Sequence, residues 1–179
     1  MNPTVFVSRQ LVNDFRDQLG CILARAPRRF DVLEFTPDIK LTPEQHASIE
    51  VTFYSRDIWQ GTIKTHLSPA AAVYWPIIDT APNLKWIQVV SAGADQKPYQ
   101  TSISRGLRVT TSAGGNAEYV GLTAATGLFM LARNFPHWLR AQQRREWAPQ
   151  LGAASPEDLM GQTAIIVGMG HIGKVIARY

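Results

Sequence analysis

Residues 162–179, QTAIIVGMGHIGKVIARY, contain the pattern that decides the fold. Residues 164–167 are a short, fully apolar run of the kind that forms a buried parallel strand. Three glycines with G-x-G-x-x-G spacing follow at once, in GMGHIG, and a helical pattern begins after them. Strand, glycine loop and helix in this order predict the first βα unit of a Rossmann-type domain.

The three glycines predict a loop that holds a pyrophosphate. Gly168 permits the tight turn, Gly170 leaves the backbone open to the phosphates, and Gly173 lets the helix pack close to the strand. The amides of the first helical turn point at the anion, and the helix dipole favours it. We therefore expect NAD or NADP as the cofactor. The expected cofactor-binding residues are Gly168, Gly170, His171, Ile172 and Gly173.

Length and composition limit the number of domains and the class of protein. At 179 residues and 45% apolar, the chain suffices for one domain, or for one domain and part of another. The net charge of +4 comes from scattered basic residues without a nucleic-acid-binding module. The densest basic group is Arg140, Arg144 and Arg145, which we expect to form a solvated helix face, the alternative being a phosphate or nucleic-acid patch.

The single Cys21 excludes an intramolecular disulfide and fits a reducing compartment; we expect it to be a small core residue. No secretory signal and no apolar segment long enough to span a membrane is visible. We therefore expect a cytoplasmic protein that binds neither nucleic acid nor membrane.

Strand and helix patterns alternate through residues 1–112. Strands are predicted at 4–7, 30–35, 50–54, 84–90 and 108–111, and helices at 10–25, from 42 and at 69–78. The helix at 10–25 is predicted to be amphipathic, with Leu11, Phe15 and Leu19 on its apolar face. This alternation predicts an α/β fold with a doubly wound parallel sheet, of the flavodoxin-like kind.

A long helix at 117–133 is predicted to follow Asn116. It is apolar almost all round and carries small residues, among them Gly121 and Gly127, which indicates close packing on more than one side. Its neighbour is either a second domain or a partner subunit. A polar helix at 137–147 and a helical turn at 155–158 are expected before the terminal strand.

Open α/β sheets bind their ligands at the carboxyl ends of the strands. Two candidate binding segments lie at such positions in this sequence. Arg56 follows the third predicted strand. An ordinary surface salt bridge is the favoured interpretation there, and the functional alternative, which makes Arg56 a candidate substrate-binding residue, is contact with an anionic substrate. The turn SAGAD at 91–95 follows the fourth predicted strand. Backbone amides of Ala92 and Gly93 suit a small anion nest, the alternative being a plain turn from strand to helix.

Four motifs in order resemble the D-isomer-specific 2-hydroxyacid dehydrogenases. They are VVSAGADQ, VTTSAGGNAEYVGLTAATGLFMLARN, REW and DLMGQTAIIVGMGHIGKVIA. The resemblance implies a substrate-binding domain at 1–112 and, from 113 to 179, the start of a Rossmann NAD(P)-binding domain, with the active site between the two. It also implies that Ala92 and Gly93 hold the substrate carboxylate, and that a homodimer forms through helix 117–133.

The chain departs from the family pattern in two ways. The usual Ala-Glu of the long helix is Gly121-Leu122 here. The family's catalytic Arg, Glu or Asp, and His follow the second strand of the dinucleotide fold, and none of the four histidines, His46, His66, His137 and His171, matches that His. We therefore expect a truncated chain with no catalytic residue, no metal and an incomplete cofactor site.

Hydride transfer between a nicotinamide cofactor and a small 2-keto or 2-hydroxy acid, such as glyoxylate or hydroxypyruvate, is the function that the resemblance implies. This chain is expected to be an inactive fragment of such an enzyme. The alternative is a non-catalytic carboxylate- or nucleotide-binding, regulatory domain.

Overall fold

The computed structural model describes residues 2–63 and 66–179. The chain divides into two compact units, Met1–Ala113 and Gly114–Tyr179. In the described part, no helix has both the length and the apolar character needed to cross a membrane.

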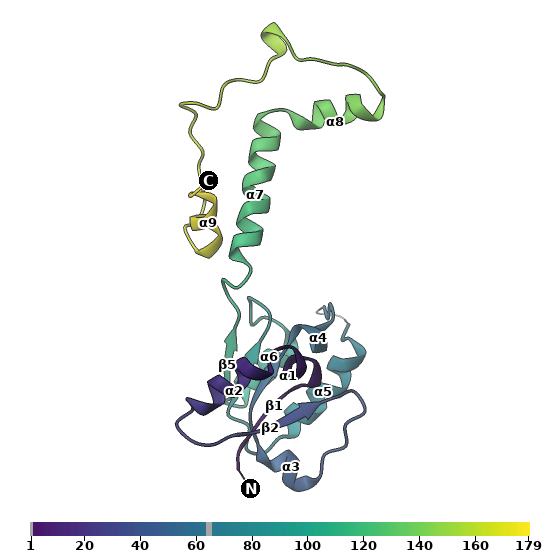
Figure 1. The fold of residues 1–179 in the computed structure, drawn as a ribbon, viewed down its shortest axis with the longest axis vertical. Coiled ribbons are helices and arrows are strands. Elements are labelled where there is room, and N and C mark those ends of the chain that lie inside the picture. Colours follow the sequence, from purple (N-terminus) through teal and green to yellow (C-terminus); the bar gives the residue numbers. More distant parts are fainter. Residues whose placement is uncertain (1, 64–65) are drawn as a thin grey trace. The chain divides into compact units, whose positions relative to one another are not determined.

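The first unit is built on a five-stranded sheet (Figure 1). Its strands are β1 (Thr4–Ser8), β2 (Asp31–Phe35), β3 (Ile49–Tyr54), β4 (Trp86–Val89) and β5 (Arg108–Thr111). The order in the sheet is β2-β1-β3-β4-β5, and every neighbouring pair is parallel. This is the flavodoxin-like order, so the predicted doubly wound parallel sheet is confirmed.

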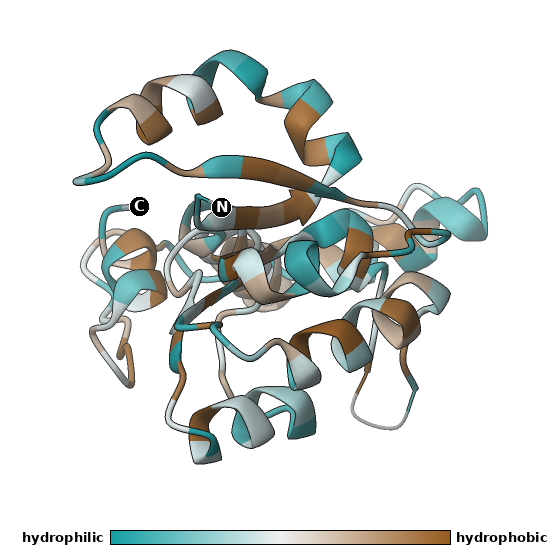
Figure 2. Cartoon of the chain, turned by 90° about the horizontal axis from the view of Figure 1, so that it is seen from below, coloured by the Kyte–Doolittle hydropathy of each residue, from teal (hydrophilic) through white to brown (hydrophobic). Residues whose placement is uncertain are grey.

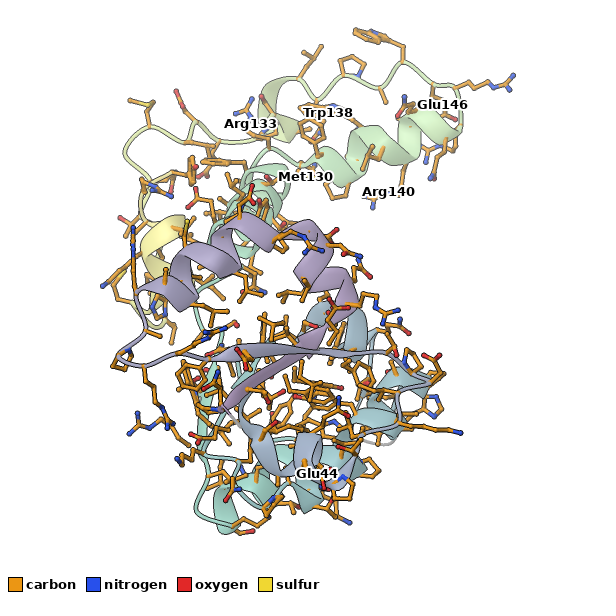
Figure 3. All side chains as sticks on the ribbon, turned by 60° about the horizontal axis from the view of Figure 1, so that its bottom comes forward. Glu44, Met130, Arg133, Trp138, Arg140 and Glu146 are labelled. Atoms are coloured by element: carbon orange, nitrogen blue, oxygen red, sulfur yellow. The ribbon has the colours of Figure 1, made fainter. Side chains whose placement is uncertain are left out.

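Helices connect the strands on both faces of the sheet. They are α1 (Arg9–Asp14), α2 (Arg16–Ala24), α3 (Pro43–Ser48), α4 (Arg56–Trp59), α5 (Pro69–Thr80) and α6 (Lys97–Ser104). Right-handed crossovers place α3, α5 and α6 on one face and α1 with α2 on the other. Figure 3 shows this division, with α3, which carries Glu44, across the sheet from the purple α1 and α2.

Local sequence signals explain where α3 and α5 begin. Thr42 and Gln45 form a reciprocal capping box at the start of α3. The Ser68 hydroxyl accepts from the Ala71 amide at 3.0 Å at the start of α5. Both helix starts were predicted, and both are confirmed.

The core of the first unit lies between the sheet and α5. Phe6 of β1 stacks on Tyr74 of α5 with ring centroids 6.1 Å apart, and Tyr54 of β3 contacts Trp75 at 4.8 Å. Thr52 is the polar residue in this layer: its hydroxyl donates to the Phe6 carbonyl at 2.7 Å and lies 2.7 Å from the Tyr74 hydroxyl. Apolar stretches mark the strands in Figure 2, whereas the helices are mixed.

The helix predicted at 10–25 differs from the structure. Phe15 breaks it into α1 and α2, and Val12 is the buried residue of the two helices. Phe15 is 52% exposed and Ile22 66% exposed, and Cys21 is exposed rather than in the core. The physical reason is that α1 and α2 are the only helices on their face of the sheet in the described residues, so nothing packs against their outer side.

The second unit consists of α7 (Ala117–Ala132), α8 (Phe135–Gln143), a 3-10 turn η1 (Gly152–Ala154) and α9 (His171–Ile176). Asn116 holds the N-cap position of α7, as predicted, although its side chain makes no capping bond. The polar helix predicted at 137–147 instead starts after the left-handed Asn134 and ends at Gln143. The turn predicted at 155–158 is wrong, because the helical turn forms at η1.

The predicted basic helix face is formed only in part. Arg140 lies in α8, whereas Arg144 and Arg145 follow its end at Gln143. All three are exposed, and Arg144 donates to Glu146 at 2.8 Å. In Figure 3 the labelled side chains of Arg140 and Glu146 project from α8 and the segment after it.

The buried strand predicted at 164–167 is not formed. Ile165 is 87% exposed and Val167 97% exposed, while Ile166 lines an apolar hollow of about 730 Å³ beside Leu128 and Phe129 of α7. Ile165 and Val167 therefore point away from the side chain of Ile166, as alternate residues of an extended chain do. The described residues of this unit supply no strand to pair with this segment. The hydrophobic run therefore lacks the neighbours that a buried parallel strand requires.

Thr52→Val tests the polar contact in the core. The substitution keeps the shape but leaves the buried Tyr74 hydroxyl without its partner, which typically costs about 1–3 kcal/mol. We expect urea denaturation to show a loss of that size. Thr101→Val, at an exposed hydroxyl that donates to Lys97 within α6, is the matched control. Equal losses in the two variants would contradict this account of the core.

Candidate functional site

In the turn after β4, residues 91–95, three backbone carbonyls are engaged in hydrogen bonds within the first unit. The Ser112 amide donates to Ser91 O at 2.9 Å, the Ser91 hydroxyl to Gly93 O at 2.8 Å, and Gln100 Nε2 to Ala94 O at 2.6 Å. Carbonyl oxygens that already accept hydrogen bonds are turned away from an incoming anion and do not repel it. The backbone amides of the same turn can then donate hydrogen bonds to that anion. An added Cβ at Gly93 would lie 3.3 Å from an Asp95 carboxylate oxygen, so the turn is tightly packed on this side.

Tyr99, in the first turns of α6, supports this turn from below. It is fully buried and packs against Tyr54 and Trp75 at centroid distances of 6.1 and 5.7 Å. Burial raises the pKa of Tyr99 to about 12, partly offset by the Ser91 hydroxyl. The phenol therefore stays neutral at physiological pH.

Arg56 stands at the same edge of the sheet. It is the first residue of α4, is exposed, and follows Tyr54, whose strand β3 is the neighbour of β4. Arg56 lines a hollow of about 520 Å³ that also includes Val90, the residue before the glycine turn. The structure thus brings Arg56, Ala92 and Gly93 to the carboxyl ends of two adjacent strands.

The glycine loop of the second unit has the backbone that its sequence predicts. Gly168 has φ +95°, a left-handed value that side chains disfavour. A Cβ on Gly173 would lie 2.0 Å from the Gly168 carbonyl oxygen, so the loop closes only with glycine there. A Cβ on Gly170 would meet nothing within 4 Å, which leaves the backbone approachable.

Three contacts hold α9, and with it the loop, on α7. Val175 fills the space above Gly121, where an added Cβ would lie 2.4 Å from Val175 Cγ1. Arg178 donates to Glu118 at 2.7 Å, and Tyr179 donates to the same carboxylate at 3.1 Å. Hydrogen bonds from Arg178 and Tyr179 hold the pKa of Glu118 below its usual range.

The side chain of His171 has a packing role. An added Cβ on Gly114 would lie 2.9 Å from its ring, so the imidazole rests against that glycine. The ring accordingly lies on the α7 side of the loop.

Two further histidines contact backbone carbonyls. His46 Nε2 lies 2.9 Å from Ile77 O, and His137 Nε2 lies 3.1 Å from Ala148 O. Both rings are half-buried rather than on the open surface, and neither belongs to the sheet edge just described.

Two parts of the site escaped sequence reasoning. Leu11, Phe15 and Phe53 line the hollow beside Arg56, but helical spacing assigned the first two to a core. The Glu118–Arg178 pair joins residues 60 positions apart, which a single sequence does not connect. The close contact at Gly121 could have been predicted from the sequence. Glycine there replaces the alanine of the family pattern, and Val175 occupies the space that this leaves.

Gly173→Ala and Gly170→Ala form a matched pair that tests the loop. Alanine at 173 collides with the Gly168 carbonyl, so we expect large amide shifts in the two-dimensional NMR spectrum across residues 168–176 and fast hydrogen exchange in α9. Alanine at 170 enters open space and should leave α9 as protected as in the parent. Indistinguishable spectra for Gly173→Ala and the parent chain would contradict the loop geometry.

Comparison with known proteins gives this geometry a context. The family model for the NAD-binding domain of D-isomer-specific 2-hydroxyacid dehydrogenases matches residues 125–179. The chloroplastic/mitochondrial formate dehydrogenase of Arabidopsis thaliana is 31% identical over 101 residues, which are 56% of this chain and 26% of that protein. The hydroxypyruvate reductase of Thermotoga maritima is 27% identical over 109 residues, or 61% of this chain and 35% of that protein.

Solved structures share the fold. A D-lactate dehydrogenase from Treponema pallidum superposes with a TM-score of 0.59 at 17% identity, over 99% of this chain and 49% of that one. The matched segments thus span about a quarter to a third of the curated relatives named above and about half of this structure. Residues 125–179 thus correspond to part of the NAD-binding domain of the D-isomer-specific 2-hydroxyacid dehydrogenases, and the chain is similar to members of that family.

Proposed function

We propose that this chain is part of an NAD(P)-dependent oxidoreductase that moves a hydride between the nicotinamide and a small 2-keto or 2-hydroxy acid. One observation carries the proposal: the glycine loop that matches the family's NAD-binding domain has the strained turn at Gly168 and the close approach at Gly173 that a pyrophosphate loop needs.

The first unit supplies the acid site. In this proposal the amides of Ala92 and Gly93 hold the substrate carboxylate, and the guanidinium of Arg56 adds a positive charge at the same sheet edge. The site therefore orients the acid by its carboxylate. Glyoxylate and hydroxypyruvate are the substrates that we would try first.

The second unit supplies the cofactor loop. Amides of His171, Ile172 and Gly173 face the pyrophosphate in this proposal, while Gly168 and Gly170 shape the turn and keep its backbone open. When bound, NAD or NADP provides the hydride chemistry, and the protein provides orientation.

A homodimer through α7 is the assembly that we propose. Large apolar side chains of α7 are exposed in the chain, namely Tyr119, Leu122, Leu128, Phe129 and Leu131. Such a surface on one helix is typical of a subunit interface. We also propose a cytoplasmic location, since the single Cys21 is free and needs no oxidising compartment.

A second candidate function is binding without turnover, in a carboxylate- or nucleotide-binding regulatory domain. Hydride transfer to a keto acid needs a proton donor at the substrate oxygen. His46 and His137 already contact backbone carbonyls, so neither ring is placed to be that donor, and this favours the second candidate.

Carboxylate binding tests the first unit. We expect glyoxylate to shift the Ala92 and Gly93 amide resonances in an NMR titration, and Arg56→Gln to weaken binding by about 3- to 30-fold, the value of a charge-assisted contact. Arg29→Gln is the control, since Arg29 is an exposed cation near the amino end of β2 that pairs with Asp31. Saturation without shifts at the turn would place the acid elsewhere.

A turnover assay tests the binding-only candidate, and NADH binding tests the oxidoreductase proposal. We expect the 179-residue chain to bind NADH and glyoxylate without oxidising NADH, measured by the loss of NADH absorbance. Measurable oxidation would eliminate the binding-only candidate. Failure to bind NADH at all would contradict the oxidoreductase proposal.

A further inference from the structure

The hollow beside Arg56 has a composition that selects among keto acids. Part of its wall is apolar and comes from three elements: Leu11 of α1 with Phe15 just after it, Phe53 of β3, and Val90 at the end of β4. Its volume of about 520 Å³ exceeds what a carboxylate and a keto group need.

The charges of the hollow disfavour a substrate with a second anionic group. Arg56 is its one cation among the lining residues, whereas Asp14 and Asp57 are acidic. The Ser55 hydroxyl donates to Asp57 at 2.6 Å and thereby keeps that carboxylate at the rim. Once the substrate carboxylate has used the charge of Arg56, a second anionic group would face two carboxylates and a largely apolar wall.

Phe15 gives the hollow an aromatic side. It sits where α1 ends and α2 begins, with φ −130° and ψ 30°. The ring is half-exposed, so it offers surface that a ligand can cover. Val90, which lines the hollow, directly precedes the glycine turn in the chain, so the proposed carboxylate site begins one residue after a residue of the hollow.

We propose that this hollow receives the distal group of the acid and that the substrate is a 2-keto acid with an uncharged, apolar side chain rather than a phosphorylated or dicarboxylic one. Leu11, Phe15 and Phe53 are the specificity-determining residues. The inference rests on the proposed function, because it takes the carboxylate to lie on the Ala92–Gly93 turn.

The test compares four keto acids on the full 179-residue chain by NMR titration at fixed ionic strength. Glyoxylate has no distal group, 2-oxoisocaproate has an apolar one, oxaloacetate a carboxylate and phosphohydroxypyruvate a phosphate. We expect 2-oxoisocaproate to bind about tenfold more tightly than glyoxylate, since a half-buried alkyl group contributes that order of affinity. Oxaloacetate and phosphohydroxypyruvate should bind no more tightly than glyoxylate.

Variants locate the effect. Phe15→Ala should reduce the preference for 2-oxoisocaproate over glyoxylate at least threefold without changing glyoxylate binding. Ile22→Ala, at an exposed apolar residue of α2 outside the hollow, is the matched control and should change neither.

The outcomes are distinct. If no keto acid shifts the Ala92 and Gly93 amides, the proposed carboxylate site and this inference both fail. If all four shift those amides but oxaloacetate or phosphohydroxypyruvate binds most tightly, or Phe15→Ala weakens glyoxylate equally, the carboxylate site stands and the apolar specificity is overturned.

Discussion

The close approach of α9 to the Gly168 carbonyl is the constraint on which the cofactor loop depends. It is possible because Gly173 has no side chain, and it fixes the first turn of α9 against the preceding loop. A second missing side chain, at Gly121 of α7, lets Val175 settle onto that helix. The two glycines act together, since one shapes the loop and the other anchors the helix that carries it. The Glu118–Arg178 pair adds orientation at an exposed position, where an ion pair contributes little stability.

A different constraint organises the first unit. All five strands are parallel, so their carboxyl ends meet at one edge, and every loop at that edge is a potential ligand contact (Figure 1). β3 delivers Arg56, β4 delivers the glycine turn, and β1 leads into α1, whose residues wall the hollow. The aromatic layer around Tyr74 and the buried hydroxyl of Thr52 hold β1 and β3 in register behind this edge.

The strands and caps of the first unit were predictable because their signals are local. Thr42, Ser68 and the apolar strand runs act within a few residues, and the structure confirms them. Predictions failed where the result depends on distant neighbours. Helical spacing placed Phe15 in a core, but no element packs over that side of α1 and α2 among the described residues. The run at 164–167 has strand character, yet a strand needs a partner, and the described residues of the second unit provide none. The hollow beside Arg56 could not be predicted from the sequence either, because its lining residues come from three separate elements.

Hydrogen–deuterium exchange with and without NADH shows whether the glycine loop is a preformed dinucleotide site. We expect NADH to slow exchange at the amides of His171, Ile172 and Gly173, while the amides of residues 165 and 167 exchange as fast as before. Protection confined to other parts of the chain, or no protection at saturating NADH, would contradict it.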